Sequence, residues 1–319
     1  MTGDALVVLN PASAGGRTLR RWPATMRALR SAGVTFDVHR TVGPGDATHA
    51  VRTAIQRGCR TIVAVGGDGT LNEVVNGFFD AEGAPIGGDA MLALLPSGTG
   101  GDFRRAVGIP SDIDAAARLI AIGSVRHIDA GRIEFGNGDL RFFINIADCG
   151  MGGEVVARVN RRTSNRGVRG SAIFLGTSLV TLLGYTSRSA RIEIDGMLIE
   201  RDVRSVVIAN GRYFGGGMHV APNAALDDGQ FDVVIIGETG RARALTGIPS
   251  LYRGRHLGRR EVEVYRARTV RVACEGEPML FDVEGEQVGT TPATLTCLPD
   301  AISLCVPEAS GGRSPSISC

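Results

Sequence analysis

Residues 61–77 read Thr61-Ile-Val-Ala-Val-Gly66-Gly67-Asp68-Gly69-Thr70-Leu-Asn72-Glu73-Val-Val-Asn76-Gly77, a β-rich run that passes through three glycines and one aspartate into a helix. Backbone N–H groups of a glycine turn and of a helix N-terminus together form a site for phosphate. A carboxylate repels a polyphosphate, so Asp68 fits there only if it binds Mg²⁺ or takes a proton from an attacking hydroxyl. The motif therefore favours phosphoryl transfer, and its structural alternative is a glycine-rich turn without a ligand.

The residues after this turn predict a helix. Thr70 and Glu73 have the spacing of a capping box. Apolar residues at i, i+3, i+4, i+7 and i+8 would form one stripe, which packs the helix on a sheet and aims its N-terminus at the turn. These residues are Leu71, Val74, Val75, Phe78 and Phe79.

Two familiar phosphate loops are excluded by the sequence. The chain contains no lysine, so neither a P-loop nor a lysine-dependent protein kinase site is present. The dinucleotide fingerprint G-x-G-x-x-G also fails, because Asn72 occupies the position of its third glycine.

The first 130 residues alternate strands with helices. Strands are predicted at Ala5–Leu9, Thr35–Arg40, Thr61–Val65 and Met91–Leu95, and helices near Thr18–Ala32, near Ala47–Arg57 and after Thr70. Such alternation predicts a parallel sheet covered by helices. Polar loops follow Leu9, Val65 and Leu95, and because ligands bind beyond the carboxyl ends of parallel strands, these loops predict one shared site.

From about Gly131 the pattern changes to short strands with few helices. Asp195-Gly196 predicts a hairpin turn, and one helix is expected near Arg241–Leu257. The strands are expected at Leu140–Ile146, Arg191–Ile194, Val203–Ala209, Gln230–Ile236, Glu261–Tyr265, Thr269–Ala273 and Thr294–Leu298. We therefore expect an α/β domain at residues 1–130, a β-rich domain at 131–308 and a disordered tail at 309–319.

Charge and cysteine content restrict the partners and the compartment. The net charge of +2 does not indicate nucleic acid. The six cysteines form no C-x-x-C pair and no secretory signal is evident, which favours a reduced cytoplasmic protein. Five arginines between Arg158 and Arg169 precede the apolar run Ala172–Gly184, a pairing typical of contact with a membrane surface; a solvated loop before a core helix is the alternative.

Other polar stretches add candidate ligands. Ser97, Thr99 and the backbone of Gly98, Gly100 and Gly101 offer donors to phosphate, which Arg17, Arg104 and Arg105 could neutralise. The turn at Asp227-Asp228-Gly229 can supply Mg²⁺ with a carboxylate and carbonyls. The three acids in Phe281–Glu286 are on their own typical of a solvated turn.

In this order the motifs resemble the bacterial diacylglycerol kinase-like lipid kinases, relatives of sphingosine and ceramide kinases. The resemblance rests on Asn10-Pro-x-Ser13, Gly66–Gly77, Pro96-x-Gly-Thr-Gly-x-Asp-Phe103, Leu226-Asp-Asp-Gly229 and Glu284-Gly-Glu286, and it extends to about residue 305. NAD kinases share the glycine–aspartate turn but do not usually continue into Leu-Asn-Glu-Val-Val-Asn-Gly.

The resemblance implies an N-terminal three-layer α/β nucleotide-binding domain of the NAD kinase and phosphofructokinase type, a C-terminal β-sandwich and a cleft between them. It implies that Asp68 positions phosphates and metal-bound water, and that Asp129 and Glu286 lie near the acceptor hydroxyl. Asp228 would hold Mg²⁺ with carbonyls of Ala225 and Gln230. ATP would lie over the three loops, at Asn10, Pro11, Ser13, Gly66, Gly67, Asp68, Gly69, Thr70, Asn72, Glu73, Ser97, Gly98, Thr99, Gly100 and Asp102.

Two positions depart from the family pattern. Gly101 stands where the family usually has asparagine, so a side-chain amide is missing near the nucleotide. Glu284 stands where it usually has aspartate, which changes the reach of that acid by one methylene.

The expected activity is transfer of the γ-phosphoryl group of ATP to a lipid hydroxyl, with Mg²⁺, at a membrane surface that the protein visits peripherally. Diacylglycerol, a sphingoid base and a phosphatidylglycerol-like headgroup all offer a suitable hydroxyl. A kinase for a soluble acceptor such as NAD and a non-catalytic nucleotide-binding module stay open as alternatives, and the sequence also leaves a homodimer open.

Overall fold

A parallel sheet forms the N-terminal part of the protein, and the computed structural model describes residues 4–97, 101–164, 180–181 and 184–308. Its strands lie in the order β4-β3-β1-β2, and each neighbouring pair is parallel. The strands are β1 (Ala5–Leu9), β2 (Phe36–Arg40), β3 (Thr61–Gly66) and β4 (Met91–Pro96). The predicted alternation of strands and helices is confirmed.

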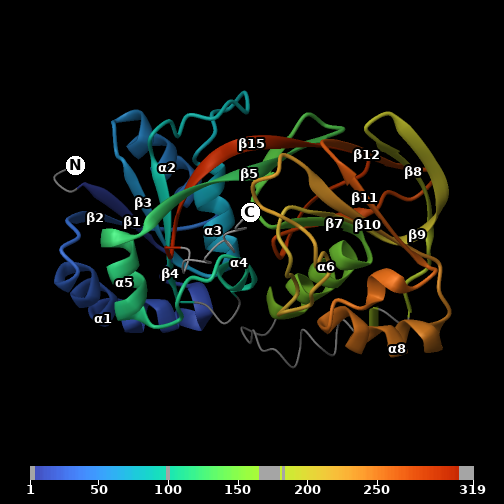
Figure 1. Cartoon of the computed structure of the whole chain (residues 1–319), viewed down its shortest axis with the longest axis horizontal. Coiled ribbons are helices and arrows are strands. Elements are labelled where there is room, and N and C mark those ends of the chain that lie inside the picture. Colours follow the sequence, from blue (N-terminus) through green and yellow to red (C-terminus); the bar gives the residue numbers. More distant parts are fainter. Residues whose placement is uncertain (1–3, 98–100, 165–179, 182–183, 309–319) are drawn as a thin grey trace, which may run out of the picture.

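Helices cover both faces of this sheet (Figure 1). One face carries α1 and α5, whose apolar residues share a core with Val7, Val63 and Ala93. The opposite face carries α2 and α3, which pack on Val8, Ile62 and Leu92. The bounds are η1 (Ser13–Gly16), α1 (Arg17–Ser31), α2 (Asp46–Gln56), α3 (Asp68–Asn76), α4 (Asp102–Ala106) and α5 (Ile113–Ile122).

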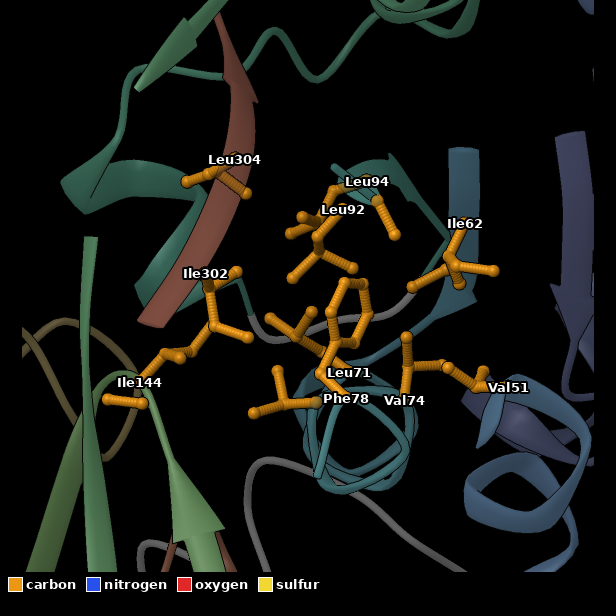
Figure 2. Packing of buried hydrophobic residues seen from close by; sticks show 14 of the residues in the cluster. Val51, Ile62, Leu71, Val74, Phe78, Leu92, Leu94, Ile144, Ile302 and Leu304 are labelled. Atoms are coloured by element: carbon orange, nitrogen blue, oxygen red, sulfur yellow. The ribbon is translucent and has the colours of Figure 1, made fainter. Parts of the chain in front are cut away.

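Helix α3 buries the apolar stripe expected from the sequence. Leu71, Val74 and Val75 are buried, and Figure 2 shows Leu71 and Val74 packed among side chains from β3, β4, α2 and β15. Phe78 and Phe79 are also buried, although they follow the helix end at Asn76. This burial holds the N-terminus of α3 against the end of β3.

The predicted capping box is wrong. Helix α3 begins at Asp68 with Gly67 as its N-cap, so Thr70 is the third helical residue and cannot cap. The Thr70 hydroxyl instead accepts a hydrogen bond from the Asn10 amide at 3.0 Å. The Glu73 carboxylate accepts one from the N–H of Gly45, the N-cap of α2, at 3.2 Å. The two side chains therefore connect α3 to other elements.

The second part of the chain is antiparallel and encloses its own apolar core. The hairpin at Asp195-Gly196 is confirmed, since Ile194 pairs with Met197. Its helical elements are α6 (Met151–Ser164), α8 (Arg241–Tyr252) and η2 (His256–Gly258), so the helix expected to reach Leu257 ends earlier. The strands are β5 (Ser124–Phe135), β6 (Leu140–Phe143), β7 (Ile146–Gly150), β8 (Arg188–Ile194), β9 (Met197–Ala209), β10 (Phe231–Gly237), β11 (Val262–Ala267), β12 (Thr269–Cys274), β13 (Leu280–Val283), β14 (Glu286–Thr290) and β15 (Ala293–Val306).

Two long strands join the parts into one sheet. Strand β5 runs without interruption through residue 130, where the sequence pattern predicted the end of the first domain. Strand β15 pairs with β5 over most of its length, and its Ser303 and Leu304 pair in parallel with β4 (Figure 1). The end of the described chain thus returns to the N-terminal sheet, and Ile302 and Leu304 complete the core around α3 (Figure 2).

One predicted strand is divided. Leu140–Ile146 was expected to be continuous, but β6 ends at Phe143 and β7 begins at Ile146. The N–H groups of Ile144 and Asn145 donate to Glu284 instead of to a strand.

Most of the apolar run 172–184 and the arginines at 166 and 169 lie outside the described residues. The described residues include no helix that is long and apolar enough to cross a membrane.

Candidate active site between the two parts of the sheet

The three polar loops meet at one edge of the parallel sheet, as the sequence predicts. Asn10, after β1, reaches Thr70 on α3. Ser13 donates to the hydroxyl of Thr18 at 2.5 Å, and Ser97 at the end of β4 donates to the same oxygen at 2.9 Å. Because β1, β3 and β4 are neighbours, these short side chains are enough to hold the loops together.

A cavity of about 190 Å³ opens at this edge. The glycine turn lines one side of it with Gly66, Gly67 and Asp68, and Gly101 lies opposite. Arg21 and Arg104 contribute positive charge to its wall. A phosphate group in this cavity would meet glycine backbone, the start of α3 and two guanidinium groups, which is a favourable set for an anion.

Asp68 lies at this cavity and is held by the neighbouring loop. Its carboxylate accepts a hydrogen bond from the Gly101 N–H at 3.1 Å. Burial raises the pKa of Asp68, the nearby charge of Asp102 adds to the rise, and the Gly101 hydrogen bond opposes it. A bound cation would favour the ionised form, so this aspartate is suited to hold a metal or a metal-bound water.

Glu286 reaches the same place from the β-rich part. A Cβ atom added at Gly69 would lie 2.8 Å from Oε1 of Glu286, so the carboxylate lies against the backbone next to Asp68. Gly69 is the residue that leaves room for it. The structure therefore brings Glu286 against the residue that follows Asp68, although 218 positions separate Asp68 and Glu286 in the sequence.

Glu284 ties the turn before Glu286 to its surroundings. Its Oε1 accepts hydrogen bonds from the N–H groups of Ile144 at 2.8 Å and Asn145 at 2.7 Å, and its Oε2 accepts one from the Asn72 amide at 3.0 Å. Burial raises the pKa of Glu284 to about 7 against these hydrogen bonds, with a smaller contribution from Asp68. Glu284 was not among the predicted site residues. The sequence feature that could have indicated it is its position in Glu284-Gly285-Glu286, one residue away from the predicted Glu286.

Two further buried acids lie behind this turn. Asp148 on β7 pairs in register with Asp282 on β13 and accepts a hydrogen bond from Ser205. Burial raises the pKa of both carboxyl groups, that of Asp282 to about 7. Asp148 and Asp282 thus border the site, and burial favours the protonated, neutral form of both.

Asp102 connects the loop after β4 with the β-rich part. One carboxylate oxygen pairs with Arg105 at 2.7 Å and the other accepts a hydrogen bond from the Gly216 N–H at 2.8 Å. The Arg105 guanidinium lies 5.8 Å from the centre of the Tyr213 ring. Asp102 therefore holds the two walls of the cleft at a fixed separation, besides its predicted place at the nucleotide.

Asp129 is held in a different neighbourhood. It is buried, and its two oxygens accept hydrogen bonds from the N–H groups of Gly229 at 2.7 Å and Asp300 at 3.0 Å. These bonds fix the turn that carries Asp228. The structure thus groups Asp129 with the predicted metal turn, and its predicted place near the acceptor hydroxyl stays a prediction.

The predicted Mg²⁺ turn has a suitable donor set and a competing cation. The Asp228 carboxylate accepts a hydrogen bond from the Gln230 N–H at 3.1 Å and forms an ion pair with Arg266. No cluster of three or more His, Cys, Asp or Glu side chains suited to a metal occurs among the described residues. One carboxylate with carbonyls and water is nevertheless the set that Mg²⁺ commonly takes, so Asp228 fits this ion if Arg266 moves aside.

The remaining predicted residues are distributed around the glycine turn. Pro11 lies in the loop after β1. Asn72 is buried and donates to the carbonyl of Phe142 at 2.9 Å as well as to Glu284. Glu73 directs its carboxylate toward α2. Gly98, Thr99 and Gly100 lie outside the described residues, and the roles of all these residues at a nucleotide stay predictions.

Comparisons with known proteins agree with this arrangement. Residues 4–133 match the family of the diacylglycerol kinase catalytic domain, and residues 147–306 match the YegS C-terminal NAD kinase beta sandwich-like domain. The chain is 31% identical over 305 residues to the diacylglycerol kinase of Bacillus subtilis (strain 168), with 95% of this chain and 96% of that protein covered. It is 36% identical over 282 residues to the probable lipid kinase YegS-like of Pseudomonas aeruginosa, with 86% and 87% covered.

Solved structures from Bacillus anthracis str. Sterne share the fold. One superposes with a TM-score of 0.75 at 25% identity over 95% of both chains. A diacylglycerol kinase superposes with a TM-score of 0.69 at 22% identity, over 97% of this chain and 98% of the other. The likeness thus covers both parts of the sheet.

Proposed function

This chain belongs to the diacylglycerol kinase-like lipid kinase family, and from that membership we propose that it transfers the γ-phosphoryl group of ATP to a hydroxyl of a lipid, diacylglycerol being the first candidate. The observation that carries the proposal is the approach of Glu286, from the β-rich part, to Gly69 beside Asp68. A nucleotide held by the loops would present its last phosphate to an acid from the opposite wall.

Each acid has a separate task in this proposal. The acceptor oxygen attacks the γ-phosphorus, the bond to the β–γ bridging oxygen breaks and ADP leaves. Glu286 takes the proton of the acceptor hydroxyl, as a general base within reach of the transferred group. Asp68 would orient the phosphates and hold the metal ion that accompanies them, while Arg21 and Arg104 offset the charge that develops on the phosphoryl oxygens.

Mg²⁺ is expected at two places. Asp68 would hold the ion that accompanies the nucleotide, where it supplies charge neutralisation to the phosphates. Asp228, with the carbonyls of Ala225 and Gln230, would hold the other, at the turn that Asp129 fixes through Gly229.

The acceptor class follows from the named relatives, and no described residue separates diacylglycerol from a sphingoid base. The protein would therefore visit a membrane surface peripherally to reach its acceptor. A kinase for a soluble acceptor such as NAD would work without vesicles or detergent, and a non-catalytic module would bind ATP without turnover.

The deciding experiment measures transfer of label from γ-labelled ATP to a panel of diacylglycerol, sphingosine, phosphatidylglycerol and NAD, with Mg²⁺ present. We expect product with diacylglycerol in mixed micelles. Product with NAD alone would support the soluble-acceptor alternative, and ATP binding without any product would support the non-catalytic one. Either result would refute the proposal.

A further inference from the structure

Residues 241–260 form a strongly basic segment. They contain six arginines and one histidine and no acidic residue. Since the whole chain has 35 arginines and 33 acids, the other residues together carry a net charge of −4. This segment comprises α8, the following turn and η2, and with residues 158–169, which carry five arginines and no acid, it is one of two strongly basic stretches of the chain.

The fold holds this segment rigidly on the β-rich part. Buried His256 places its Nε2 2.9 Å from the carbonyl oxygen of Val220. Arg259 donates to the carbonyl of Arg243 at 3.1 Å and pairs with Glu261 at 2.7 Å, so it fastens η2 to α8. Leu251 and Leu257 pack on an apolar cluster of β7, β9 and β10. Arg243, Arg253, Arg255 and Arg260, all exposed, thus project from a fixed base.

Four of these arginines and one tyrosine are exposed. Arg243, Arg253, Arg255 and Arg260, with Tyr252 at 45% exposure, define what we call the α8 basic face. None of the four makes a salt bridge with the part of the chain that the structure describes. Exposed arginines on a segment that also exposes an aromatic ring suit an anionic surface with a less polar layer beneath it.

Contacts connect the α8 basic face with the nucleotide loop. Gly254 lies so close to His219 that an added Cβ would be 3.0 Å from its Nδ1. The His219 ring stacks on the Tyr213 ring with centres 4.5 Å apart. The Arg105 guanidinium lies over the same Tyr213 ring. Arg105 pairs with Asp102, next to the Gly101 N–H that holds Asp68. The basic face and the cleft are therefore parts of one packed assembly, and Figure 1 shows α8 along the edge of the β-rich part.

We propose that the α8 basic face docks on the surface of a bilayer that contains anionic phospholipids. This inference rests on the proposed function, because a lipid acceptor is available to the cleft only at a bilayer. Outside residues 158–169 and 241–260 the chain has 24 arginines and 33 acids, a net charge of −9 that such a surface repels, so docking would also orient the molecule.

The test is sedimentation of the full chain with vesicles, in the absence of ATP. We expect binding to phosphatidylcholine vesicles that contain phosphatidylglycerol and little binding to pure phosphatidylcholine. The triple variant Arg253→Gln, Arg255→Gln, Arg260→Gln should lower the partition coefficient roughly a hundredfold, since each arginine near an anionic surface contributes about fivefold. Circular dichroism will verify that the variant is folded.

The matched control removes the same charge from the N-terminal part. Arg27, Arg40 and Arg57 are exposed, and their joint replacement by glutamine should change the partition coefficient by less than about threefold. Equal losses in the two triple variants would overturn the proposal. So would absence of binding to anionic vesicles, or tighter binding to double-stranded DNA than to these vesicles at the same salt concentration.

The docking surface and the proposed function can fail separately. Turnover of a short-chain diacylglycerol in free solution should be unchanged in the Arg253, Arg255, Arg260 variant. If no lipid is phosphorylated but the variant still loses vesicle binding, the docking proposal stands and the kinase proposal falls. If the lipid is phosphorylated but vesicle binding is the same in wild type and variant, the kinase proposal stands and the docking proposal falls.

Discussion

The side-chain amide of Asn72 donates a hydrogen bond to the carboxylate of Glu284 at 3.0 Å, between residues 212 positions apart. Asn72 belongs to α3, which begins at Asp68, and Glu284 belongs to the turn that leads into Glu286. This hydrogen bond therefore connects the helix that begins with Asp68 to the turn that carries Glu286. The hydrogen bonds from Ile144 and Asn145 fix Glu284 itself.

Replacement of Glu284 by alanine should destabilise the protein by at least about 2 kcal/mol, because it leaves two buried N–H groups without their acceptor. Unfolding in urea, followed by circular dichroism, measures the change. Glu82→Ala, at an exposed loop position, is the control and should stay within about 0.5 kcal/mol of the wild type. Equal effects of the two substitutions would contradict the structural role of Glu284.

Asp282 and Glu284 should lower the stability of the protein as the pH rises from about 5 to 7, against the opposite contribution of His219 and His256, whose pKa burial lowers. The pKa values of Asp282 and Glu284 are both raised to about 7 by burial, from 3.8 and 4.5. In that pH range the folded state keeps protons that the unfolded state has released, so a rise in pH favours unfolding. Above about 7 the effect levels off. Urea unfolding at pH 5, 6 and 7 measures it, and Glu284→Gln should make the dependence shallower; an unchanged slope would exclude Glu284 as a source.

Most of the N-terminal part could be predicted from the sequence, because β1, β3 and β4 are continuous apolar runs that each end in a loop with glycines. β1 was predicted with its observed bounds, and the three loops meet as expected. β5 was missed because its polar residues, such as Arg126 and Asp129, interrupt the apolar pattern. Those residues make ion pairs and hydrogen bonds that only the folded chain supplies.

The capping box and the role of Glu284 show the same limit within the site. Thr70 and Glu73 have the spacing of a cap, but the helix begins two residues before Thr70, since Gly67 already provides an extended N-cap. Glu284 was expected in a solvated turn, yet its carboxylate accepts hydrogen bonds from Asn72, on a distant helix, and from the N–H groups of Ile144 and Asn145. Local spacing cannot reveal a partner 212 positions away.

Asp102→Asn should loosen the connection between the nucleotide loop and the β-rich part. The Asp102 carboxylate accepts from Gly216 on one oxygen and from Arg105 on the other, and an amide can satisfy only one of them. Hydrogen exchange of the Gly216 amide should accelerate roughly tenfold, the scale of a hydrogen bond to a charged group. Asp114→Asn, at an exposed position, is the control and should leave this amide unchanged. Unchanged exchange in Asp102→Asn would show that the bond does not hold the loop.

Arg266→Gln should strengthen Mg²⁺ binding at Asp228, because Arg266 is the cation that now pairs with this carboxylate. Calorimetric titration with Mg²⁺ should give a dissociation constant several-fold lower than that of the wild type. Arg268→Gln removes a neighbouring charge without a salt bridge to Asp228 and serves as the control. The heat of Mg²⁺ binding should disappear in Asp228→Asn. If it persists in this variant, the ion binds at another place.

Glu286→Gln should lower turnover by roughly two orders of magnitude, the scale for loss of a general base, with ATP binding almost unchanged. Initial rates with labelled ATP and equilibrium ATP binding measure the two quantities. Asn137→Ala, at an exposed turn, is a control that should leave both the same. Full turnover in Glu286→Gln would remove this residue from the chemistry.

Gly69→Ala tests whether Glu286 acts from its observed position. The new Cβ would lie 2.8 Å from Oε1 of Glu286, so the flexible carboxylate must leave its observed position. Turnover should therefore fall at least tenfold while the fold is retained. In a Glu286→Ala background no carboxylate is left to displace, and Gly69→Ala should then have little further effect. Such non-additivity in a double-mutant cycle is expected only if the two residues act through their contact, and additive losses would show that the alanine disturbs the phosphate turn itself.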